Sequence, residues 1–346
     1  MRKFVIVFFL LTMLITPVSA LELTAPEIPK EYEKFMPSNQ ENFADGLFEV
    51  LRDALMYIRP DLKEAASICF QIIAVVMLIS LVRTFPGTFG KTVNLAECLG
   101  ISLILLDASN SLINLATATI TQISEYGKLL LPVMTAALSG QGGITKATAL
   151  YTGTVLFDAL LCAIIGKLLT PLIYLFLFLA VACGAIGDEK LKQLRDSLKW
   201  VITWVLKTIL YIYTGYIGIT GVVSGTTDAA ALKAAKLTIS NVVPVVGSIL
   251  SDASEAVLVS AGVVKNAAGI YGLFATIAIW IGPFLQIGIH YLLLKATGAV
   301  CSVFAEKQSV SLIQDFSAAL GLLLAMTGTI CFMLLISMVC YLRGVV

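Results

Sequence analysis

The sequence predicts an all-α, polytopic helical membrane protein with about 7–9 membrane segments and a short extracytoplasmic amphipathic lead-in. Three observations predict this fold class. Hydrophobic residues make up 58% of the 346 residues, and the mean hydropathy is +0.94. Charged residues make up only 13%, about half of the ~25% that soluble domains carry. The charges gather in short clusters between long apolar runs, as loops do between membrane spans.

Residues 1–20 have the three parts of a secretory signal peptide. Arg2 and Lys3 form a basic start, residues 4–15 form an apolar core, and small residues end the segment at Ala20. The pattern predicts cleavage after Ala20. An uncleaved membrane anchor is the alternative, but the apolar core is short for a span.

Residues 21–64 form a polar lead-in that is predicted to lie outside the cytoplasm, and acidic residues outnumber basic ones there. Apolar residues at helical spacing predict an amphipathic helix over about 39–58, ended by Pro60. Its apolar face could rest on the membrane surface, on a partner or on the rest of this chain. The acidic polar face argues against adhesion to anionic lipid.

Residues 65–346 are predicted to form one multi-span membrane domain. Two segments are uncertain, because 129–139 is too short for an ordinary crossing and 238–264 is interrupted by Pro244 and Gly247. The seven clearer crossings are residues 65–82, 98–124, 147–166, 168–186, 201–223, 267–294 and 316–342.

Basic residues predict the orientation of the loops, because cytoplasmic loops are enriched in lysine and arginine. The segment 187–200 carries four basic residues and is predicted to be cytoplasmic. Arg83 and Lys91 mark a second cytoplasmic loop. The lead-in lies on the opposite side in this topology.

Several ionisable residues fall inside predicted spans, where each charge costs about 2.5–3.5 kcal/mol. Asp252 and Glu255 stand three residues apart, so a helix places them on one face. They could form a cation or proton site or line a water path; alternatively, Lys236 or Lys265 neutralises them near the interface. The other such residues are Asp107, Asp158 and Lys207, and Asp107 shares the predicted span 98–124 with the polar residues Asn110 and Asn114.

The sequence predicts no metal, cofactor or catalytic residue. His290 is the only histidine, and none of the seven cysteines forms a CxxC pair. No phosphate-binding glycine loop of the GxxxxGK[ST] type is present. A net charge of +1 without a basic cluster gives no support to nucleic-acid binding.

One segment is more specific than the composition. It reads KAAKLTISNVVPVVGSILSDA over 233–253 and continues as VKNAAG over 264–269. This segment resembles the stage III sporulation protein AE family of endospore-forming bacteria, and the order of signal peptide, acidic lead-in and multi-span body is similar as well.

The resemblance implies a membrane subunit of a channel, or feeding tube, between mother cell and forespore. This assembly is required for sporulation after engulfment. It would sit in the mother-cell membrane around the forespore, with other stage III sporulation membrane proteins as partners. The subunit would line the conduit or scaffold it. A stand-alone secondary transporter of a small solute or ion is the alternative, and co-purification would separate the two. The resemblance carries over no catalytic residue.

The segment 241–269 is the candidate functional segment, predicted to be a broken or re-entrant hairpin in contact with water or a partner. A simple kink at Pro244 is the alternative. Gly221 and Gly225 have GxxxG spacing, which suits internal packing or a homo-oligomer contact. The candidate residues are Asn241, Pro244, Gly247, Asp252, Glu255, Lys265, Asn266 and Gly269.

Overall fold

The computed structural model describes residues 25–38, 43–85, 90–242 and 247–343, and within these it describes the backbone alone for residues 43, 91 and 220–265. The described chain is helical throughout and contains no strand, which confirms the predicted fold class. Two short elements occur, η1 (Lys30–Phe35) and a π-turn, η2 (Ile165–Leu169). The α-helices are α2 (Phe43–Tyr57), α3 (Arg59–Arg83), α4 (Gly90–Gly140), α5 (Ile144–Ile164), α6 (Thr170–Ile186), α7 (Glu189–Val242), α8 (Gly247–Cys301) and α9 (Lys307–Leu342).

Six helices of the described part are long and apolar enough to cross a membrane. This number is below the predicted seven to nine because predicted neighbours merge into single rods. The predicted segments 98–124 and 129–139 are both part of α4, which continues through Pro132. The segment 238–264 lies largely where side chains are outside the described residues.

α5 and α6 also form one continuous rod, although two separate crossings were predicted at 147–166 and 168–186. The π-turn joins them, and Pro171 stands at the start of α6. Proline donates no backbone N–H, so the α-helical hydrogen bond that would end at Lys167 cannot form. A widened turn at this point keeps the helix continuous without that bond.

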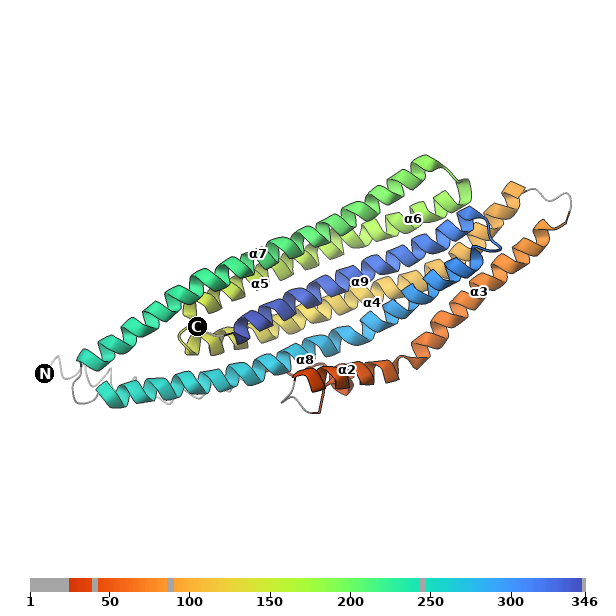
Figure 1. Cartoon of the computed structure of the whole chain (residues 1–346). Helices are drawn as coiled ribbons and strands as arrows, with labels where there is room; N and C mark the ends of the chain where they lie inside the picture. The colour runs from red at the N-terminus through yellow and green to blue at the C-terminus, as the bar shows by residue number, and fades with distance from the viewer. Residues whose placement is uncertain (1–24, 39–42, 86–89, 243–246, 344–346) are drawn as a thin grey trace.

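The helices are much longer than one bilayer requires. α4 has 51 residues, which at 1.5 Å per residue is about 77 Å. A bilayer core of about 30 Å takes about 20 residues. The rods run lengthwise along one another, with α9 inside the bundle and most of its side chains buried (Figure 1).

Three connections lie at one end of the bundle, which we call the loop end: α3–α4, α6–α7 and α8–α9 (Figure 1). An ion pair of 3.9 Å between Arg83 Nη1 and Glu306 Oε1 ties two of them together. The two clusters predicted to be cytoplasmic, Arg83 with Lys91 and residues 187–200, therefore share this end. The end of α9 and the α4–α5 turn lie at the opposite end, and α7 and α8 extend beyond it.

The lead-in docks on the bundle, which is one of the three placements considered for it. Phe35 is buried, and its ring lies 3.3 Å from where a Cβ on Gly282 would be. The Tyr32 hydroxyl donates a hydrogen bond of 2.5 Å to Gln122 Oε1 of α4. Burial, followed by the nearby charge of Glu31, raises the pKa of Tyr32 to about 12, so its hydroxyl remains a donor at neutral pH.

α2 agrees with the predicted amphipathic helix of about 39–58, and Val50 and Ala54 on its inner face are buried. Ser38 precedes it and contacts Glu49, with Ser38 Oγ donating to Glu49 Oε1 over 2.6 Å. Pro60 was predicted to end the helix. α2 does end just before it, at Tyr57, and Pro60 occupies the first turn of α3, where a missing N–H costs nothing.

Candidate functional site

The candidate segment includes the last residues of α7 and the first part of α8. α7 ends one residue after Asn241, and α8 begins at Gly247. Pro244 lies outside the described residues. α8 then continues to Cys301 as one helix, so the segment is the far end of a helical hairpin. The structure describes only the backbone at Asn241, Gly247, Asp252, Glu255 and Lys265, and likewise at the GxxxG glycines Gly221 and Gly225.

Asn266 and Gly269 mark the point where α8 leaves the bundle. Asn266 is exposed and Gly269 is buried. A Cβ on Gly269 would lie 2.5 Å from Leu342 Cδ2 and 2.9 Å from Met134 Cε, so the helix passes very close to α9 and α4 here. Beyond this point α7 and α8 continue as a two-helix arm past the other rods (Figure 1). The part of α8 that belongs to the arm, residues 247–269, is about 33 Å long.

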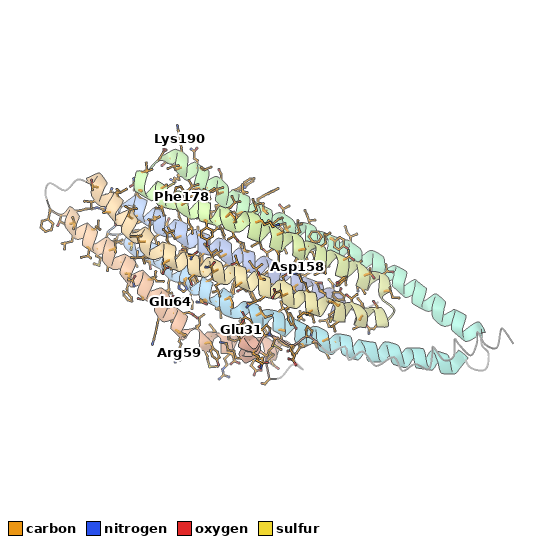
Figure 2. All side chains as sticks on the ribbon, turned by 180° about the vertical axis from the view of Figure 1, so that it is seen from behind. Glu31, Arg59, Glu64, Asp158, Phe178 and Lys190 are labelled. Atoms are coloured by element: carbon orange, nitrogen blue, oxygen red, sulfur yellow. The ribbon has the colours of Figure 1, made fainter. Side chains whose placement is uncertain are left out.

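Asp158 of α5 finds its partner on α4. Ser124 Oγ donates a hydrogen bond of 2.5 Å to Asp158 Oδ2 (the position of Asp158 is labelled in Figure 2). A second contact between buried polar groups lies close by, with Thr154 Oγ1 2.7 Å from Ser337 Oγ. These bonds satisfy polar groups within the bundle, which is the structural role that a buried acid most often has.

Lys207 and His290, the other polar residues singled out from the sequence, occupy ordinary positions. Lys207 is exposed on α7, where its long stem can carry the ammonium group away from apolar surroundings. His290 is buried, with Nδ1 2.9 Å from the Gln286 carbonyl oxygen. Within the described ranges, no group of three or more His, Cys, Asp or Glu side chains could hold a metal ion.

The loop end contains two buried ion pairs. Arg83 Nη2 lies 2.5 Å from Oε2 of Glu97, whose side chain is fully buried, and Arg83 also donates to Asn94. Arg195 pairs with Asp315 across 120 residues of sequence, and both side chains are largely buried. Charged side chains are rarely buried unless they are paired in this way. The pairs hold α3 against α4 and α7 against α9.

A polar pocket of about 230 Å³ opens beside the second pair. Its lining includes Lys192, Lys307, Asp188 and Gln308. The Gln308 amide packs against Gly187, whose φ of +74° and lack of a side chain both suit glycine, since a Cβ there would lie 2.3 Å from Gln308 Nε2. The lining carries both signs of charge, so it does not single out a class of ligand.

α4 presents an unusual outward face. Near the loop end its exposed large side chains are all leucine, at Leu95, Leu99, Leu103 and Leu106. From Asp107 to Lys128 the exposed side chains are polar or small, and they recur every three or four residues, which places them on one face of the helix. We call this face the polar stripe: Asp107, Asn110, Ser111, Asn114, Ala118, Thr121, Glu125 and Lys128.

The polar stripe lies between neighbouring elements that contact α4 on both flanks. On one flank, the Tyr174 hydroxyl of α6 donates to Asn110 Oδ1 over 2.8 Å. On the other, the Tyr32 hydroxyl of the lead-in donates to Gln122 Oε1, and α3 approaches α4 nearer the loop end, where a Cβ on Gly100 would lie 3.3 Å from Val75. Figure 2 views the molecule from this side, with α4 between α3, which carries Glu64, and α6, which carries Phe178.

Sequence reasoning identified Asp107, Asn110 and Asn114 only as polar residues within a span. Their spacing together with Thr121 and Glu125 is the signal that predicts a continuous face. The Arg195–Asp315 pair carries no such signal, because its members are far apart in sequence.

Comparison with known proteins places the chain in a family. The family model of stage III sporulation protein AE matches residues 30–343. Stage III sporulation protein AE of Bacillus subtilis (strain 168) is 26% identical over 185 residues, which cover 54% of this chain and 46% of that protein. The match therefore spans just under half of that relative's length. No solved structure matches. The chain belongs to the stage III sporulation protein AE family, and it is a multi-pass helical membrane protein with a role in sporulation.

Proposed function

We propose that this chain is a membrane subunit of the channel assembly between mother cell and forespore, located in the mother-cell membrane that surrounds the forespore. It lines the conduit or scaffolds it, and it works with other stage III sporulation membrane proteins rather than as an enzyme. A signal peptide at residues 1–20 directs its insertion. The family match over residues 30–343 supports the sporulation role, and the six long apolar helices support residence in a membrane.

The α7–α8 arm is the observation that carries the assembly role. The arm leaves its own bundle, and its sequence over 241–264 is rich in valine, with eight valines and three alanines. Apolar helices without neighbours are unstable in water, so the arm needs further protein or lipid around it. A subunit that inserts an arm into an assembly satisfies this need.

Deletion of the gene tests the sporulation part of the proposal. Vegetative growth should stay normal, and development should stop after engulfment. Complementation with the full chain is the control for effects on neighbouring genes. Normal spore yield in the deletion strain would overturn the proposal.

Crosslinking in membranes of sporulating cells tests the assembly part. A photoreactive residue at Asn266, exposed at the base of the arm, should capture other sporulation membrane proteins or further copies of this chain. The same residue at Leu156, exposed on α5, is the matched control and should capture little protein. Purification of the chain alone, without any crosslinked protein from Asn266, would favour a stand-alone transporter.

A further inference from the structure

The bundle exposes chemically different surfaces at one depth. The Ser124–Asp158 hydrogen bond of 2.5 Å fixes the level of the Thr121–Glu125 part of the polar stripe against α5. At that level the α5–α7 side exposes Leu156 and Leu160. On α7, Tyr211 and Ile212 are exposed and stand next to Tyr213, whose hydroxyl lies 3.3 Å from Thr154 Oγ1 of α5.

No single solvent suits both surfaces. In lipid on all sides, the carboxylates and amides of the polar stripe would face hydrocarbon, which is costly. In water on all sides, the large apolar side chains of α5 and α7 would form an exposed apolar patch. A bundle with lipid on one side and water on the other satisfies both sets of side chains.

We propose that the polar stripe of α4 faces a water-filled passage, that the α5–α7 side faces lipid, and that further copies of this chain complete the wall of the passage. This inference rests on the proposed role in a conduit and names the surface that forms it. A single helix face cannot enclose water. Cyclic symmetry around a central axis would turn the same face of every copy inward.

The chemistry of the polar stripe indicates what such a passage would admit. Its middle, from Asn110 to Thr121, is uncharged and suits small polar solutes. Glu125 and Lys128 stand three residues apart and offset each other's charge. Asp107 has no such neighbour on the stripe, so several copies would place a ring of carboxylates at this level, and such rings favour cations over anions.

Cysteine accessibility in the full chain tests the water-facing surface. In a variant that lacks the seven native cysteines and still supports spore formation, Thr121→Cys and Glu125→Cys, which flank Ser124 on the stripe, should react with a membrane-impermeant, charged thiol reagent. Leu156→Cys and Ile212→Cys are the matched controls at neighbouring depths and should remain unmodified. Equal reaction at all four positions would place this part of the bundle in water on every side. Protection at both stripe positions would place the stripe against protein or lipid. Either result overturns the inference.

The carboxylate ring has its own measurement. At Asn110→Cys, a cationic thiol reagent should react about tenfold faster than an anionic reagent of similar size. Asp107→Asn should remove most of that difference while labelling itself persists. An unchanged ratio would overturn the ring.

A photoreactive residue at Tyr174, beside the stripe, tests whether copies of this chain complete the wall of the passage. It should link one copy of this chain to another, and links only to other proteins would overturn a wall of identical chains. Failure of the wider conduit role gives a different result: the stripe would label as expected in a strain whose spore yield does not depend on the gene.

Discussion

Arg83 at the end of α3 meets the fully buried carboxylate of Glu97 in α4, with Nη2 2.5 Å from Oε2. The same guanidinium donates to Asn94 Oδ1 over 2.6 Å and approaches Glu306 in the α8–α9 connection. One side chain thus joins three segments of the loop end. Its removal would leave a buried charge without its partner.

The first prediction concerns this pair. Arg83→Ala should lower the free energy of unfolding by about 3–5 kcal/mol, because the Glu97 carboxylate would remain buried and unpaired. Thermal or denaturant unfolding of the detergent-solubilised protein measures the loss. Lys192→Ala is the matched control, since Lys192 and Glu189 form an exposed pair of 3.8 Å at the same end. That change should cost less than about 1 kcal/mol. Equal effects of the two substitutions would contradict the role assigned to burial.

A second prediction concerns the close approach of α5 and α7. A Cβ on Gly153 would lie 2.0 Å from Tyr216 Cε1, and the Tyr216 hydroxyl donates to the Ala149 carbonyl oxygen over 3.0 Å. Gly153→Ala should therefore displace the ring and destabilise the protein by about 1–3 kcal/mol. Gly166→Ala, where no atom lies within 4 Å of the new Cβ, should be neutral or stabilising. Combining Gly153→Ala with Tyr216→Ala should cost less than the sum of the two, and strict additivity would argue against the contact.

The third prediction is the orientation. With the loop end in the cytoplasm, Lys192→Cys should be protected from an impermeant thiol reagent added outside, whereas Glu33→Cys in the lead-in should react. Both residues are polar and outward-facing, so their difference reports the side of the membrane. Sequencing of the mature protein should begin at Leu21 if the signal peptide is cleaved. The reverse labelling pattern would invert the topology.

The fourth prediction concerns the acids of the α7–α8 arm. If Asp252 and Glu255 contact water or a partner there, replacing both with leucine should impair sporulation while protein level and membrane insertion remain normal. Asp252→Asn with Glu255→Gln is the control that keeps the size and polarity. Full spore yield from the double leucine variant would show that the acids only balance nearby lysines.

Long apolar runs made much of the fold predictable. The uninterrupted run 316–342 becomes the interior helix α9, and the clean run 168–186 becomes α6. Span boundaries were less predictable. Hydropathy treats Lys167 and the 125–128 cluster as breaks between spans, but a continuous helix carries a charge on its outward face without interruption. Whether a charge ends a helix depends on which way it faces, and that is a property of the packed bundle.

The functional surfaces, like the spans, were predictable from the sequence only in part. The end of α7 at Val242 and the start of α8 at Gly247 agree with the interruption that Pro244 and Gly247 predict, because proline and glycine act on the local backbone. The polar stripe was only partly visible, as Asp107, Asn110 and Asn114. The docking of Tyr32 on Gln122 joins residues 90 apart, and no local pattern predicts it.

The length of α7 has a mechanical consequence. α7 runs from Glu189 to Val242, 54 residues, which is about 81 Å at 1.5 Å per residue, whereas a bilayer core is only about 30 Å thick. α8 returns alongside α7, so the two helices together form an arm of fixed length. The number of residues in the two helices then sets the distance between the bilayer surface and a partner that binds the end of the arm. A partner that lies closer to or further from the membrane would require an α7–α8 arm of a different length.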